Sequence, residues 1–183
     1  MIIMAMRQLV KKLTEMNRQG NLKDDNLRPV VEYRITDHYS KPMMKVADHF
    51  RKMGMDAEAR RIYGQMGAIK AGSNRMLQTL GTENVKLAKQ IERNMVGKSR
   101  SGYIPTGNLM RSIEAHMTED GRVQVYPNVR ANKGNGAEYG GYVEYGTRRH
   151  PTPEPFMYQS MKQMRPIVAA ELAALMKGMT AVE

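Results

Sequence analysis

Two glutamates and a histidine lie within ten positions of one another and are the chain's clearest candidates for acid–base chemistry. Glu144, His150 and Glu154 could accept and donate protons if the fold brought their side chains together. A reaction also needs a nucleophile or a distinctive electrophile beside them, and this stretch supplies neither. We therefore expect a structural role for the three residues and no enzymatic activity.

Two other patterns resemble ligand-binding motifs but lack the required spacing. Gly97-Lys98-Ser99 ends like a phosphate-binding loop, but that motif needs a second glycine five positions earlier, where this chain has glutamate. Asp-His pairs occur at 37–38 and 48–49, and on one continuous helix they would lie ~16 Å apart, too far to share a metal ion. The chain has no cysteine. We expect no metal site, no disulfide and no cofactor.

The stretch YGGYVEYGTRRHPTPEPF, residues 139–156, contains the acid–base candidates and must position them. Alternation predicts a short strand over 142–147. Tyr142 would share one face of this strand with Glu144. Val143 and Tyr145 would lie on the opposite face and pack against the core.

In such a strand, Glu144 would lie away from the core and need water or a cation. Arg148, Arg149 or a neighbouring subunit could provide the cation. Gly146 would end the strand. Alternating prolines then hold the chain extended until a helix can begin at Pro155, whose missing N–H is not needed in a first helical turn. This connector favours positioning over chemistry.

The first half of the chain predicts a series of helices from apolar spacing and from stop signals at glycine. The expected helices cover residues 2–17, 40–53, 56–67 and 82–97. Residues 30–37 fit either a strand or a helix, because the apolar residues alternate but the flanks look helical.

The second half predicts a small sheet and a final helix. Alternating residues at 113–117 and 123–125 flank a turn at 119–121, which predicts a hairpin. A single helical turn precedes it at 108–111. We expect an α+β fold with a helical N-terminal half, an antiparallel sheet of about three to four strands, and a long C-terminal helix packed across it. The predicted buried sheet face comprises Val143, Tyr145, Ile113, Val123 and Val125 against Phe156, Ile167 and Leu172. The basic helical region 1–97 and the region 98–183 are expected to form one compact domain.

Positive charge is concentrated in the N-terminal part. The net charge is +11, and residues 1–110 carry 20 Lys and Arg against 10 Asp and Glu. This imbalance suits a polyanion, contacted without sequence reading, or a simply solvated helical face. No apolar run approaches the ~20 residues of a membrane helix, and no signal peptide is recognisable. We expect a chain that is soluble and intracellular at the point of synthesis, with no membrane partner.

Three segments in fixed order resemble the neck and tail-completion family of tailed bacteriophages. They are TGNLMRSI (106–113), YGGYVEYGT (139–147) and PTPEPFMYQSM (151–161). The matching positions are Thr106, Gly107, Leu109, Ser112, Ile113, Tyr139, Tyr142, Val143, Glu144, Tyr145, Gly146, Thr147, Pro155 and Phe156. The resemblance covers roughly residues 100–178, and the basic stretch 20–97 is less typical of the family.

The resemblance implies a structural protein of the virion, located at the head–tail junction. It implies a homo-oligomeric ring, with a hexamer favoured over a dodecamer, that contacts neighbouring neck and tail proteins and surrounds DNA without sequence specificity. The structural-motif residues above, with Arg148 and Arg149, would then serve subunit contacts or local architecture. A tail terminator or a head-closure protein is the first alternative. A non-specific nucleic-acid-binding accessory protein is the second.

Overall fold

The computed structural model describes residues 28–98, 104–128, 139–148 and 150–180. The predicted helix over 2–17 and the side chain of Arg149 lie outside the described residues. In chain order the elements are β1 (Val31–Tyr33), α2 (Ser40–Lys52), α3 (Asp56–Met95), α4 (Asn108–Ser112), β2 (Ile113–Met117), β3 (Val123–Pro127), α5 (Tyr139–Tyr145), α6 (Phe156–Gln163) and α7 (Arg165–Thr180). The fold is α+β, as the sequence predicts.

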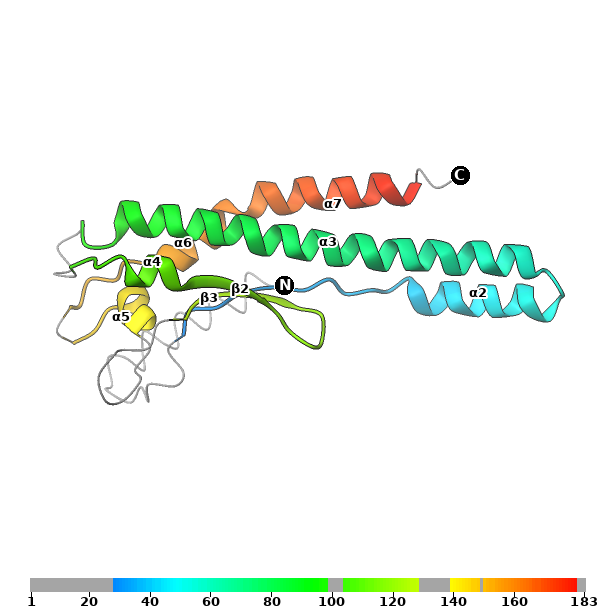
Figure 1. The fold of residues 1–183 in the computed structure, drawn as a ribbon, viewed down its shortest axis with the longest axis horizontal. Coiled ribbons are helices and arrows are strands. Elements are labelled where there is room, and N and C mark those ends of the chain that lie inside the picture. The colour runs from blue at the N-terminus through cyan, green and yellow to red at the C-terminus, as the bar shows by residue number, and fades with distance from the viewer. Residues whose placement is uncertain (1–27, 99–103, 129–138, 149, 181–183) are drawn as a thin grey trace.

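Helix α3 is 40 residues long and runs the length of the molecule (Figure 1). The prediction of two shorter helices, over 56–67 and 82–97, was wrong, because glycines in this region are places of close packing or open space and do not stop the helix. A Cβ on Gly81 would lie 2.7 Å from Cγ1 of Val123 in the sheet, and one on Gly72 would lie 2.7 Å from Cδ1 of Leu175 in α7. Glycine there lets α3 approach both neighbours.

The sheet has three antiparallel strands in the order β1-β3-β2. The predicted hairpin is confirmed, and Gly121 provides the positive φ of +75° in its turn. The ambiguous segment 30–37 contains β1, which pairs with β3 through Val31 opposite Val125. The strand predicted over 142–147 was wrong: most of that segment is helix α5, so β1 is the third strand of the described sheet.

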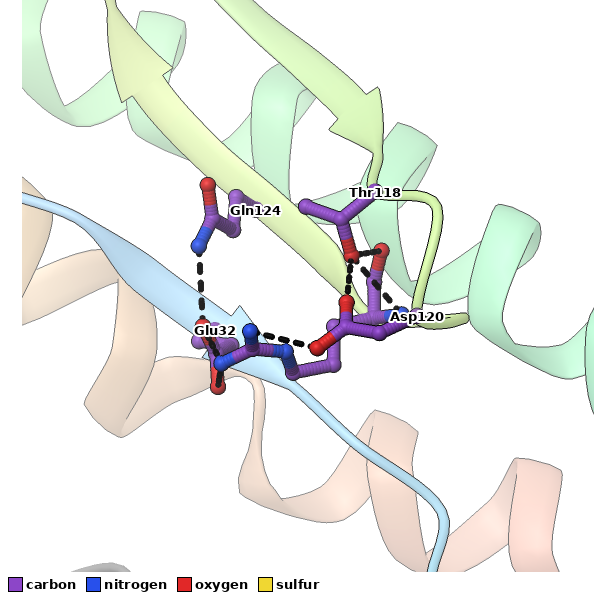
Figure 2. Close-up of polar contacts among 5 residues, drawn as sticks. Glu32, Thr118, Asp120 and Gln124 are labelled. Atoms are coloured by element: carbon purple, nitrogen blue, oxygen red, sulfur yellow. Dashed lines mark hydrogen bonds and ion pairs between the residues drawn. The ribbon is translucent and has the colours of Figure 1, made fainter.

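A polar network ties β1 to the hairpin turn (Figure 2). Arg122 donates from Nη1 to both Glu32 oxygens at 3.1 Å, and its Nη2 lies 2.5 Å from Oδ2 of Asp120. Gln124 donates to Glu32 at 2.9 Å, and Thr118 donates to Asp120 at 2.5 Å. The Arg122 guanidinium lowers the pKa of Asp120, and the two carboxylates raise the pKa of Arg122. Glu32 is thereby bound by one residue of the hairpin turn, Arg122, and by one residue of β3, Gln124.

Helix α2 and the first half of α3 form a helical hairpin that extends well beyond the sheet (Figure 1). The predicted helix over 40–53 is confirmed as α2, and Gly54, with a φ of +78°, makes the turn. Ala47 of α2 and Ala59 of α3 are buried between the helices. We call residues 40–75 the arm.

The C-terminal helix is divided into α6 and α7 at Met164. Pro166 has no N–H with which to continue the helical hydrogen-bond ladder through this point. Both helices pack on α3. Ile167 packs beside the buried Met164, and Leu172 is 49% exposed. The prediction that these two side chains bury the sheet face was therefore wrong.

The main core lies where α3, the sheet, α4, α5 and α6 meet. Its largest member is Phe156, which is fully buried at the start of α6. The other buried members are Val31, Leu77, Ala88, Ile91, Val96, Leu109, Ile113, Val123, Val125, Val143 and Met157. The predicted burial of Ile113, Val123, Val125 and Val143 is confirmed, although Val143 reaches the core from a helix.

Candidate functional site

The three segments that carry the family resemblance meet at one end of the molecule. α4 lies beside the sheet, α5 packs near it, and α6 begins next to both (Figure 1). We call this region the junction and define it by Leu109, Gly140, Glu144, Glu154 and Phe156. The sequence separates these residues by up to 47 positions, so the fold alone brings them together.

The first segment forms the tight entry into α4. Gly107 has a φ of +75°, which glycine adopts without strain. Thr106 accepts a 3.4 Å hydrogen bond at Oγ1 from the Asn108 N–H, and Ser112 donates from Oγ to the Leu109 carbonyl at 2.7 Å. These bonds close the short helix and direct Leu109 into the core, where it is 2% exposed.

The second segment forms α5, which packs closely on the first. A Cβ on Gly140 would lie 2.7 Å from Cγ of Pro127 and 3.4 Å from Cδ1 of Leu109. Only a glycine lets α5 sit this close to β3 and α4. Tyr139 opens the helix, and Tyr142 and Tyr145 are half-buried.

Glu144 binds the start of the third segment. Its Oε2 accepts the Met157 N–H and its Oε1 accepts the Tyr158 N–H, both at 2.9 Å. Since α6 begins at Phe156, these amides belong to its first turn and have no carbonyl partner within the helix. The side chain is 4% exposed. The prediction that Glu144 faces away from the core toward water or an arginine was therefore wrong.

Burial dominates the acidity of Glu144. The pKa of the carboxyl is raised to about 7, because the effect of burial is larger than the opposite effect of the Met157 and Tyr158 N–H donors. The neighbouring Tyr145 hydroxyl also has a raised pKa, first through burial and then through the charge of Glu144. The helix dipole favours a carboxylate at a helix N-terminus, but the burial of Glu144 outweighs this effect, so the folded protein keeps the proton to a higher pH than an ordinary glutamate does.

Glu154 binds the backbone just beyond the C-terminal end of α3. Both of its oxygens accept the Gly97 N–H, at 3.0 and 3.2 Å, and its own N–H donates to the Val143 carbonyl at 2.9 Å. Its side chain is 1% exposed. Glu92 is also buried, and its pKa is raised, first by burial and in smaller part by the charge of Glu154. Glu154 thus links α3, α5 and the connector to α6.

The connector between α5 and α6 is closed by local hydrogen bonds. Gly146 has a φ of +78° and donates its N–H to the Tyr142 carbonyl at 2.9 Å. Thr147 donates its N–H to the His150 carbonyl at 2.7 Å, and its Oγ1 accepts the His150 N–H at 3.0 Å. Arg148 is exposed to solvent. Pro155 directly precedes α6, which starts at Phe156, one residue later than predicted.

The acid–base candidates are engaged with the backbone. Glu144 and Glu154 use both carboxylate oxygens to accept N–H groups, which favours a structural role for them. The aspartates of the two Asp-His pairs are engaged similarly: Asp37 accepts the Tyr39 and Ser40 amides, and Asp48 accepts the Tyr63 hydroxyl at 2.6 Å. Within the described residues, no group of three His, Asp or Glu side chains is placed to hold a metal ion.

The arm differs from the junction in charge and exposure. It carries eight Lys and Arg against three Asp and Glu, and no salt bridge joins its described side chains. Apolar side chains are exposed on it, among them Met44 at 46%, Val46 at 49% and Met53 at 53%. An open groove of about 430 Å³ lies between the arm and α7, lined by Met43, Gly72 and Leu175 among others.

Sequence reasoning missed Gly140 of the junction and the buried Glu92 beside it. A glutamate one position after Ile91 on an apolar face is the signal that could have revealed Glu92. The Gly-Gly pair at 140–141 could have indicated close packing. Neither signal identifies the partner, because Pro127 and Glu154 lie in other segments.

No protein-family model, no curated protein and no solved structure matches this chain. In the part of the chain that the structure describes, no helix has the length and apolar character to cross a membrane. The function is therefore inferred from the junction and the arm themselves.

Proposed function

We propose that this chain is a structural protein of a tailed-bacteriophage virion, a ring-forming neck or tail-completion component that joins head and tail around the DNA channel. One observation carries the proposal: the three segments that resemble this family meet in one junction. Each distinctive residue there has a structural task. Gly107 adopts a positive φ, Gly140 permits close approach, and Phe156 fills the core. Glu144 accepts the first amides of α6, and Glu154 accepts the Gly97 N–H just after α3.

The arm supports a role in assembly. Exposed methionines suit contact surfaces that must adapt to different neighbours, and the excess of Lys and Arg side chains suits a polyanion. Repeated around a ring of six or twelve copies, the arms would form a positive collar facing DNA phosphates or an acidic neighbouring ring. Contacts with DNA would be independent of sequence, because any sequence must pass through the channel.

The test is deletion of the gene from the phage that encodes this chain, followed by electron microscopy of the lysate. We expect DNA-filled heads and separately assembled tails that do not join, or tails with a defective end. Complementation with the wild-type chain should restore joined particles. Infectious, normally joined particles from the deletion would refute the proposed neck role.

A charge-reversal series locates the role of the arm within the particle. The double variant Lys45→Glu/Lys52→Glu should complement the deletion poorly, whereas Arg165→Glu on the exposed start of α7 should complement as well as wild type. Equal complementation by both variants would show that the positive charge of the arm is not needed to join head and tail. Defective tail ends with normal head closure would favour the tail-terminator alternative, and leaking heads would favour head closure.

The second candidate is a non-specific nucleic-acid-binding accessory protein, and the charge of the arm favours it. Such a protein would bind duplex DNA as an isolated subunit, with affinity that falls steeply as salt rises. Fluorescence anisotropy with DNA of unrelated sequences measures this. Tight binding by free subunits, together with normal particles from the deletion, would replace the neck role with this one.

A further inference from the structure

Among the residues that the structure describes, none bonds the backbone groups along the outer edge of β2, which lie in a regular row. The Thr118 N–H bonds the Arg122 carbonyl and the Asn128 N–H bonds the Ser112 carbonyl, which sets the alternation of the β2–β3 ladder. Even-numbered residues of β2 therefore bond β3, and the N–H and C=O groups of odd-numbered residues point away from it. Ala115 and Met117 present both groups at the edge, and Ile113 presents its carbonyl, because its N–H bonds Met110.

This edge lacks the features that usually block strand addition. β2 is five residues long and contains no proline and no lysine, and its pairing with β3 continues residue by residue without a bulge. Four of its five residues, Glu114 to Met117, are exposed. The opposite edge of the sheet, β1, has only three residues and is contacted by α6. The sheet is therefore open to pairing mainly along β2.

We propose that β2 pairs antiparallel with β2 of a second copy of this chain, about a two-fold axis at Ala115, to form a continuous six-stranded sheet. In this register each Ala115 N–H donates to the Ala115 carbonyl of the other copy. Each Met117 N–H donates to the Ile113 carbonyl of the other copy. Four main-chain hydrogen bonds form, and all use groups that point outward in the single subunit.

The side chains of β2 are complementary to themselves in this register. Glu114 lies opposite His116 of the other copy, in a pair that is not bonded through the backbone, where side chains approach most closely. The symmetry makes this carboxylate–imidazole pair twice. On the other face Met117, 36% exposed in the single subunit, lies opposite Ile113. Moving the two-fold axis by one residue would place Glu114 opposite Glu114, or His116 opposite His116, and lose these pairs.

The helices that cover the sheet are compatible with the pairing. Gly81 of α3 lies against both Val123 of β3 and Ala115 of β2, so α3 runs above the gap between these strands. With strands about 4.8 Å apart, the two α3 helices would lie about 10 Å apart, the normal distance for packed helices. The exposed residues beside Gly81 are Gln78 and Thr82, which carry no charge.

The two-fold contact is distinct from the head-to-tail contacts that would close the proposed ring. Sedimentation equilibrium of the full chain therefore tests the pairing independently of the neck role, and it needs no phage particle. We expect a dimer for wild type and at least tenfold weaker association for Ala115→Pro, which removes two of the four hydrogen bonds while sparing the β2–β3 ladder. Ala115→Ser keeps the N–H and should remain dimeric. Hydrogen exchange should show protection of the amides at 115 and 117 in wild type and in Ala115→Ser, and loss of protection of the Met117 amide in Ala115→Pro.

A charge exchange supplies a second test that does not depend on the proline variant folding. His116→Glu places two carboxylates opposite each other and should weaken association roughly tenfold. The double variant Glu114→His/His116→Glu restores the opposite pair and should recover the dimer. A wild-type chain that stays monomeric at about 0.1 mM, or an oligomer that both Ala115→Pro and His116→Glu leave unchanged, would overturn the proposal.

Discussion

The junction and the arm are built from the same kinds of helix but are stabilised in opposite ways. At the junction, Phe156 and Glu154 are almost completely buried, and two carboxylates accept backbone N–H groups at the start of α6 and just after α3. In the arm, Ala47 and Ala59 are the buried hydrophobic residues, and large side chains such as Met53 remain exposed. One end of α3 is held by side chains from distant segments and the other by a single partner helix.

This difference indicates how one chain can combine a fixed shape with an adaptable surface. The junction tolerates little change, because each group there has a defined partner. The arm can change many side chains without leaving a buried group unpaired. Matched substitutions in both regions test this contrast.

The largest effect is expected from the core of the junction. Phe156→Ala removes a fully buried ring and should lower the free energy of unfolding by about 4 kcal/mol. Met53→Ala in the arm removes a side chain that is 53% exposed and should lower it by less than about 0.5 kcal/mol. Urea denaturation of both variants measures the difference. Similar losses would show that the arm is as tightly packed as the junction.

The next effect is a pH dependence that arises from Glu144. Its pKa is about 7 in the folded protein against an ordinary value of 4.5, so the folded state keeps a proton that the unfolded state releases between these values. Its contribution to stability is therefore fully present below about pH 4.5 and is lost as the pH rises to about 7. The linked change in the free energy of unfolding is about 3 kcal/mol.

Denaturation of wild type and Glu144→Gln across this pH range measures the linkage. Glutamine does not titrate, so the variant should gain stability relative to wild type as the pH rises from 4.5 to about 7. Glu58→Gln, on the exposed start of the arm's second helix, is the matched control and should keep the wild-type slope. An identical slope for Glu144→Gln and wild type would mean that Glu144 does not titrate in this range.

A smaller effect is expected where α5 approaches the sheet. Gly140→Ala places a Cβ 2.7 Å from Cγ of Pro127, a ring atom that cannot rotate away. We expect a loss of about 2 kcal/mol in the free energy of unfolding, since α5 must move outward. Thermal unfolding provides the measurement. No loss of stability would indicate that α5 is loosely seated.

The smallest effect should have the opposite sign. Gly64→Ala in the arm meets no atom within 4 Å and lies inside a helix. Alanine has the higher helix propensity, so the variant should gain about 0.5–1 kcal/mol. The same scan of thermal unfolding measures it. A loss at Gly64 would reveal a close neighbour of the arm, such as another subunit.

The sequence predicts elements whose signals are local. The hairpin of β2 and β3 follows from alternation and from Gly121, and α2 follows from its apolar spacing and Gly54. Helix α5 was mistaken for a strand because its tyrosines and valine favour strands and alternate over only a few residues. In the folded protein, Gly140 lets α5 pack closely on Pro127 of β3. A local pattern cannot show this contact, because the two residues lie in different segments.

The long course of α3 and the task of Glu144 could not be predicted for a related reason. The sequence predicts a break between residues 67 and 82, and the reason for Gly72 and Gly81 inside a helix appears only when Leu175 and Val123 are placed beside them. Glu144 looks like a surface residue until the first turn of α6 supplies two amides. In each case the deciding partner is set by tertiary packing, whereas the segments that form the junction stand out in the sequence itself.

Helix α3 also has a mechanical consequence. At 40 residues it is about 60 Å long, and its C-terminal end is fixed through Gly97 by Glu154. A rigid rod held at one end works as a lever, so a tilt of about one degree at the junction moves the far tip by about 1 Å over that length. Small rearrangements around the buried Glu154 carboxylate would therefore displace the arm at the opposite end of the molecule.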